Sequence, residues 1–157
     1  MDLVKVKVKG REYTYSQTIG RGASGGPGFR QPVDIAIDGE VVYVLNRGSE
    51  GAKTGRVTVF NSSEEFIGQF SSYGYGDGQF VWGSSIAADK SGFVYLADEW
   101  LHRISIFNGR ADYKNADSSA KDVGQDNFIK HWGKQGANPG ELNGPAGIAF
   151  DKDENLY

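Results

Sequence analysis

The chain has 157 residues, and its 17 Lys and Arg against 20 Asp and Glu give a formal net charge of −3. This acidic balance provides no field that gathers nucleic acid or anionic lipid, so we expect neither as a partner. Cysteine is absent, which excludes disulfides and thiolate metal sites, and no stretch reaches the roughly 18 apolar residues of a membrane span.

The first ten residues alternate Val with Lys and lack the continuous apolar core of a signal peptide. Together with the absence of cysteine, this favours the cytoplasm, although the sequence leaves the compartment open. The alternation over Leu3–Val8 predicts a half-exposed strand whose lysines discourage further pairing. Tyr15–Ile19 is a weaker strand candidate, so residues 1–19 are interpreted as N-terminal strands.

From residue 20 onward, one motif occurs three times, in copies that begin at Gly20, Ser71 and Gly133. Each copy has a large apolar residue nine positions after its start, an Ile six positions later and an Asp three positions after that. Repeats of this length predict an array of like structural units. The motif residues are Phe29, Ile35 and Asp38; Phe80, Ile86 and Asp89; and Leu142, Ile148 and Asp151.

The first copy, residues 20–70, predicts four short strands. Each is rich in apolar or β-branched residues, and Asp38-Gly39 supplies a hairpin turn after the first. Residues 47–54 form a polar excursion between the second and third strands. The predicted strands are Val33–Ile37, Val41–Leu45, Arg56–Phe60 and Phe66–Phe70.

The second copy, residues 71–132, repeats this order, and its extra length falls in a polar surface loop at residues 111–125. The third copy, residues 133–157, contains a first strand at Gly147–Phe150 and the start of a second at Leu156-Tyr157. No helical period appears, so the fold class is all-β. The strands predicted in the second copy are Ser85–Ala88, Phe93–Ala97, Arg103–Phe107 and Phe128–Trp132.

The segment from Gly133 to Asp151, together with F-V-Y-L-A-D at 93–98 and R-I-S-I-F at 103–107, resembles the NHL repeat. The resemblance covers residues from about 15 to 157. It implies a six-bladed β-propeller of four-stranded antiparallel blades, of which about two and a half are present. It also implies that the ring is incomplete, so that C-terminal blades or a second chain close it. We expect a longer protein of roughly 280–330 residues, in which an N-terminal strand pairs into the last blade.

We expect a non-catalytic scaffold that binds a protein, a peptide or a small ligand, because the sequence offers no nucleophile–base pair and no clustered pair of acids. The alternative is a metal-dependent lyase or hydrolase resembling peptidyl-hydroxyglycine amidating lyase, which holds its metal with His residues just before first strands. The matching positions here are Val33, Ser84 and Ala146, none of which ligates metal as imidazole does. We therefore expect no catalytic residue, metal or cofactor in these blades, while catalytic residues in further blades stay possible and leave the enzyme question open.

Ligand candidates are residues that break the repeat, since scaffold features recur and binding residues usually do not. Asp34 and Ser85 stand where the third copy has Gly147, near the expected channel mouth. Trp82 and Trp100 are candidate anchors for a partner, with packing between blades as the alternative. Arg47 could meet an anion or acidic peptide, with a solvated loop as the alternative.

Four further residues are interpreted as structural or as ordinary surface residues. Asp98 and Arg103 recur in the first copy as Asn46 and Arg56, so a bond that fixes each blade explains them better than a ligand does. His102, like His131, is read as an ordinary surface histidine.

Overall fold

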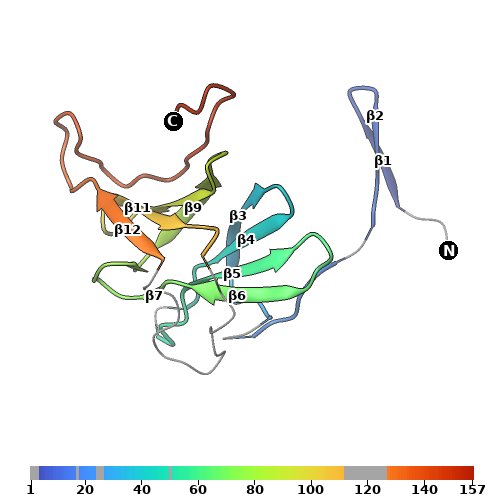
Figure 1. The fold of residues 1–157 in the computed structure, drawn as a ribbon, viewed down its shortest axis with the longest axis horizontal. Helices are drawn as coiled ribbons and strands as arrows, with labels where there is room; N and C mark the ends of the chain where they lie inside the picture. The colour runs from blue at the N-terminus through green and yellow to red at the C-terminus, as the bar shows by residue number, and fades with distance from the viewer. Residues whose placement is uncertain (1–3, 17, 24–26, 50, 112–126) are drawn as a thin grey trace.

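The computed structural model describes residues 4–16, 18–23, 27–49, 51–111 and 127–157. All regular structure within these ranges is β, which confirms the all-β prediction (Figure 1). Since no described residue is helical, none of them belongs to a helix long and apolar enough to cross a bilayer. The strands are β1 (Lys5–Val8), β2 (Arg11–Thr14), β3 (Pro32–Asp38), β4 (Val41–Asn46), β5 (Arg56–Asn61), β6 (Phe66–Phe70), β7 (Ser72–Tyr73), β8 (Gln79–Phe80), β9 (Gly83–Ala88), β10 (Phe93–Asp98), β11 (Arg103–Asn108) and β12 (Phe128–Trp132).

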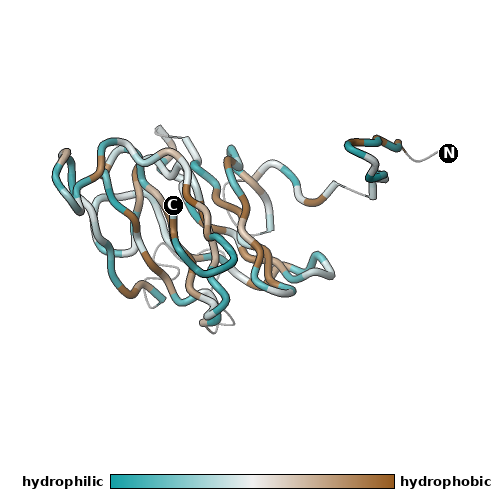
Figure 2. The backbone as a smooth tube through the Cα atoms, turned by 90° about the horizontal axis from the view of Figure 1, so that it is seen from above, coloured by the Kyte–Doolittle hydropathy of each residue, from teal (hydrophilic) through white to brown (hydrophobic). Residues whose placement is uncertain are grey.

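Two four-stranded antiparallel sheets form the body of the molecule. The first sheet has the order β3-β4-β5-β6 and the second β9-β10-β11-β12, so each follows the chain as a simple meander. The eight strands predicted for the first two copies are confirmed, each to within two residues at its ends. Figure 2 shows apolar segments along these strands and hydrophilic segments at many of the turns, as the alternating sequence predicts.

The two sheets pack face to face around one apolar core. Tyr43 and Leu45 of β4 meet Leu96 of β10 there, and all three side chains are fully buried. Burying a side chain of this size contributes about 1.5–3 kcal/mol, so this interface is a major source of stability. The Tyr43 hydroxyl donates to the Gly109 carbonyl of the second sheet at 2.7 Å, which satisfies its one buried polar group.

The start of each copy folds into the same small loop. The third residue of each copy pairs in parallel with its tenth, as β7 pairs with β8 in the second copy. Gly20, Ser71 and Gly133 all have positive φ, at 88°, 63° and 98°. That conformation suits glycine, and Ser71 adopts it while its hydroxyl donates to the Gly78 carbonyl at 2.6 Å. The equivalent parallel bridges in the first and third copies are Gly22↔Phe29 and Gln135↔Leu142.

A buried arginine holds this loop against the sheet in two copies. Arg56 donates to the Gly28 carbonyl at 2.6 Å, and Arg103 donates to the carbonyls of Gly76 and Gln79 at 2.8 and 2.9 Å. Burial lowers the pKa of both guanidinium groups. The arginine that opens each third strand is thus a loop anchor, in agreement with its structural interpretation.

The third copy departs from the prediction. No strand forms at Gly147–Phe150 or at Leu156-Tyr157, where a single antiparallel bridge joins Phe150 to Leu156. The segment instead lies along the second sheet, with the Phe150 ring edge-on to Tyr95 at 4.9 Å between centroids. The bridge and the backbone hydrogen bonds on either side of it form a short hairpin. Within the described residues, this hairpin pairs with no further strand.

The N-terminal segment forms a separate hairpin rather than a strand of either large sheet. β1 pairs with β2 across a turn at Lys9-Gly10, and every residue of both strands is exposed. Figure 1 shows this hairpin standing away from the two sheets. The predicted strand at Leu3–Val8 is present from Lys5, whereas the described residues of Tyr15–Ile19 form no strand. The predicted loop at 111–125 lies, apart from Ala111, outside the described residues.

The described residues form no closed ring of sheets. One face of the first sheet is left open, because Ile35 and Ile37 are 57% and 61% exposed. Their counterparts in the second sheet, Ile86 and Ala88, pack instead into the core between the sheets. The face that carries these residues is therefore exposed in the first sheet, whereas in the second sheet the first sheet covers it.

Candidate functional site

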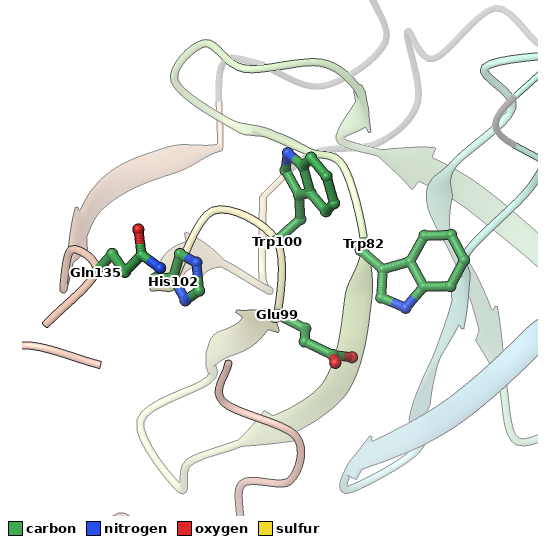
Figure 3. Close-up of a pocket in the computed structure, with 5 residues that line it drawn as sticks. All are labelled: Trp82, Glu99, Trp100, His102 and Gln135. Atoms are coloured by element: carbon green, nitrogen blue, oxygen red, sulfur yellow. The ribbon is translucent and has the colours of Figure 1, made fainter. Parts of the chain in front are cut away.

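An open pocket of about 720 Å³ lies at the end of the second sheet where β10 turns into β11. Figure 3 shows Trp100 and Glu99 between Trp82 on one side and His102 with Gln135 on the other. Trp82 comes from the link between β8 and β9. Residues 99–102 form the β10–β11 turn, and Gln135 comes from the loop of the third copy. The pocket thus joins two copies of the repeat.

Asp98 fixes both tryptophan-bearing segments. Its side chain is fully buried at the end of β10. Its carboxylate accepts four backbone N–H groups, from Val81, Trp82, Trp100 and Leu101, at 2.7, 3.2, 3.0 and 3.0 Å. Bonds from neutral donors to a carboxylate are stronger than those between neutral groups, so the two indoles stand on a rigid support.

His102 ties the third copy to this turn. Its Nδ1 accepts the backbone N–H of Gly144 at 2.9 Å. A neutral imidazole that accepts at Nδ1 carries its proton at Nε2, which is then a donor. His102 also has a φ of 52°, a left-handed conformation that a non-glycine residue adopts at some cost. His102 is therefore a fixed part of the pocket wall, held by its hydrogen bond to Gly144.

A second, smaller cavity of about 80 Å³ adjoins the pocket and shares Trp82 and Trp100 with it. Arg47 lines this cavity, with its guanidinium carbon 4.6 Å from the centroid of the Trp82 ring and its Nε donating to the Gly83 carbonyl at 3.0 Å. We call the residues that line the two cavities with polar or aromatic side chains the aromatic surface. They are Arg47, Tyr73, Tyr75, Trp82, Glu99, Trp100, His102 and Gln135.

Asp34 and Ser85 lie elsewhere, where the first strands of successive copies meet. Asp34 Oδ2 accepts the Ser85 hydroxyl at 2.6 Å and the Ile86 N–H at 2.9 Å. Ser85 Oγ in turn accepts the N–H of Ile148 at 3.2 Å. Each copy thus bonds the backbone of the next one at the same position, and this shared link gives both residues a structural role.

The structure brings three of the five sequence candidates together, namely Arg47, Trp82 and Trp100. Sequence reasoning missed Tyr73 and Tyr75, although a signal was present. Both stand in the repeated loop, where the first copy has Gly22 and Ser24 and the third has Gln135 and Ala137. Tyr73 and Tyr75 are therefore aromatic in only one of the three copies. Such a departure from the repeat is the criterion by which the ligand candidates were chosen from the sequence.

Glu99, His102 and Gln135 carried less signal, because the pocket that they line forms only where the turn at 99–102 meets the loop of the third copy. His131 lies outside the pocket, with Nδ1 3.4 Å from Asp77 Oδ1. Among the described residues, no three His, Cys, Asp or Glu side chains are grouped so that they could hold a metal ion.

No protein-family model and no curated protein matches this chain. Among solved structures, it is similar to hydrazine synthase of Kuenenia stuttgartiensis, with a TM-score of 0.51 and 15% identity over 80% of this chain and 28% of that one. It is also similar to a protein of Bacteroides fragilis NCTC 9343 that is described as exported. That match has a TM-score of 0.55 and 15% identity, over 99% of this chain and 33% of the other. The chain spans about a third of the length of these proteins, and at this identity the likeness concerns the fold alone.

Proposed function

We propose that this protein is a non-catalytic scaffold of the NHL-type β-propeller class, which binds a protein, a peptide or a small ligand at the aromatic surface. The observation that carries the binding role is the exposure of two indoles in one open pocket. Trp82 is 38% exposed and Trp100 is 62% exposed, although Asp98 holds the backbone of both in place. Exposed aromatic rings on a rigid support are typical of binding sites.

The propeller part of the proposal is supported by the link between copies. Asp34 bonds the second copy and Ser85 bonds the third at equivalent backbone positions. Units joined repeatedly by the same contact build a regular array. The open face at Ile35 and Ile37 corresponds to one that is covered in the second copy, so a further sheet fits there. In this proposal, further blades or a second chain supply that sheet and close the ring.

An array of immobilised peptides and oligosaccharides tests the binding role. The labelled protein is applied beside a Trp82→Ala/Trp100→Ala double variant. A matched control, Tyr13→Ala/Phe93→Ala, removes two exposed rings that lie outside the aromatic surface. We expect array members that bind the protein and the control but not the double variant. Capture by all three alike, or no capture by the unaltered protein, would contradict the proposal.

The enzymatic alternative draws no support from the described residues. At the positions where an amidating lyase places histidines, Ser84 donates its hydroxyl to the Pro145 carbonyl at 2.6 Å, and Val33 and Ala146 carry no ligand atoms. Stoichiometric metal in the purified protein, together with cleavage of a peptidyl-hydroxyglycine substrate, would replace the scaffold proposal with this one.

A further inference from the structure

The sequence contains two Asn-Gly pairs, Asn108-Gly109 and Asn143-Gly144. An asparagine that precedes glycine is open to a spontaneous reaction, in which the backbone nitrogen of the glycine attacks the side-chain carbonyl carbon of the asparagine. Glycine favours this attack because it has no Cβ to obstruct the approach. What surrounds the attacking nitrogen and the asparagine side chain then decides which pair reacts.

In the third copy, the attacking nitrogen faces a base. The Gly144 N–H donates to His102 Nδ1 at 2.9 Å, and a ring nitrogen that accepts a hydrogen bond has a lone pair that can take the proton. A general base lies within about 2.6–3.2 Å of the atom whose proton it takes, and this contact meets that condition. Figure 3 shows His102 near Gln135, on the side of the turn away from Trp82. His102 is thus positioned to deprotonate the nitrogen that starts the reaction.

The Asn143 side chain is free to take part. It is exposed, and it forms no hydrogen bond or ion pair with a described residue. It can therefore rotate toward the Gly144 nitrogen without breaking a contact. Gly144 has a φ of 63°, in the left-handed region that glycine occupies readily. The electrophile, the nucleophile and the base of the reaction thus meet in this one segment.

The other pair, Asn108-Gly109, has the same two residues in a different setting. The Gly109 N–H donates to the Gly92 carbonyl at 2.9 Å, and a carbonyl oxygen is far too weak a base to take an amide proton. The Asn108 side chain is also held, since its Oδ1 accepts the Arg110 N–H at 3.1 Å. Gly109 is buried at the end of the second sheet. The chain therefore provides its own comparison for Asn143.

We propose that Asn143 is a site of deamidation, with His102 as the general base. His102 Nδ1 takes the Gly144 N–H proton while the Gly144 nitrogen forms a bond to the Asn143 side-chain carbonyl carbon. The bond from that carbon to the side-chain amide nitrogen then breaks, and ammonia leaves with the proton that the imidazolium returns. Water opens the resulting succinimide ring at either carbonyl, which leaves aspartate or isoaspartate in place of Asn143.

The reaction changes the wall of the large pocket. A Cβ at Gly144 would lie 3.6 Å from Glu99 Cγ, so the modified segment adjoins a side chain that lines the pocket. The new carboxylate adds one negative charge there, which takes the formal net charge of the chain from −3 to −4. Isoaspartate also inserts a methylene group into the backbone before Gly144, which should weaken the hydrogen bond to His102.

Peptide mapping of the full chain over time at neutral pH tests the site, with chromatography and mass spectrometry that distinguish asparagine, aspartate and isoaspartate. His102→Asn keeps a side-chain oxygen that can accept the Gly144 N–H but removes the base, and asparagine tolerates the φ of 52° at this position. His131→Asn makes the same replacement at the other histidine, which lies outside the pocket. The rate at Asn143 is divided by the rate at Asn108 in each protein, so that any change in overall unfolding affects both.

We expect Asn143 to react about 10- to 100-fold faster than Asn108, and His102→Asn to slow Asn143 by a similar factor, at or below the lower end of what a positioned general base contributes in an enzyme. His131→Asn should leave the ratio of the two rates unchanged. Asn143→Ala should abolish the acidic species that forms in the unaltered protein, as measured by isoelectric focusing.

Equal rates at Asn143 and Asn108 in the unaltered protein would overturn the inference, and this comparison needs no variant. An unchanged or faster reaction of Asn143 in His102→Asn would also overturn it, because that is the result expected if His102 only holds the loop in place. Neither outcome depends on a ligand, so both are separate from the test of the binding role.

Discussion

Asp98 supports both the stability of the second sheet and the geometry of the aromatic surface, so its replacement gives the sharpest test of the structure. Its Oδ1 accepts the N–H groups of Trp82, Trp100 and Leu101, and its Oδ2 accepts the buried N–H of Val81 at 2.7 Å. In Asp98→Asn, the amide oxygen can keep the first three bonds. The amide NH₂ then faces the Val81 N–H, which sets two donors against each other.

The magnitude follows from these contacts. One lost charged bond at a buried donor, with the donor left unsatisfied, costs about 2–3 kcal/mol in Asp98→Asn. Asp98→Ala removes all four acceptors. Since three of the donors are only partly buried and water can reach them, we expect about 3–5 kcal/mol rather than the full sum. Both values are large against a total stability of about 5–15 kcal/mol for a domain.

Urea unfolding, followed by circular dichroism, measures the loss, with Glu40→Gln as a surface control expected within about 0.5 kcal/mol of the unaltered protein. The indole N–H signals of Trp82 and Trp100 should shift in Asp98→Asn, because both backbones are bonded to the replaced group. An Asp98→Asn protein as stable as the control, with unchanged indole signals, would refute the role assigned to the carboxylate.

Three other predictions concern separate features. Ser85→Ala removes the hydroxyl that bonds Asp34 and Ile148, and should lower the free energy of unfolding by about 1–2 kcal/mol, measured by urea unfolding; an unchanged midpoint would show that the link is not needed. Burial, with the nearby Asp38 carboxylate, raises the pKa of Tyr43 from 10.0 to about 12. The folded state therefore favours the neutral phenol, and the stability it contributes is complete below pH 10 and lost as the pH rises from 10 through 12. Urea unfolding across this range should show the decline, and Tyr43→Phe should reduce it; an equal decline in both proteins would assign the loss to other groups. Finally, the open face at Ile37 should cause self-association that Ile37→Glu reduces, as measured by sedimentation velocity; a monomeric unaltered protein would contradict this.

The sequence predicted the sheets well because their signals are local. Alternating Val and Ile, with turns that begin at Asp38 and Asp89, define the strands of the first two copies, and the repeat frame fixes which strands are equivalent. The third copy shows the limit of that reasoning. Its residues match the motif, but a ladder also needs neighbouring strands, and among the described residues Phe150 and Leu156 form a β-bridge with each other and with no further strand.

The site was harder to predict, because the repeat conceals contacts between copies. Asp34 and Ser85 differ from Gly147, which suggested ligand binding, and the structure shows that both accept hydrogen bonds from the backbone of the next copy. Conversely, Asn46 and Asp98 are equivalent but have different partners. Asn46 donates to the Val44 carbonyl and accepts one N–H, whereas Asp98 accepts four N–H groups. Only the second arrangement can fix two tryptophan-bearing segments at once. The change from amide to carboxylate at this one position therefore accompanies the change from a turn without a pocket to a turn that forms the pocket wall, while the strand order of the two sheets stays the same.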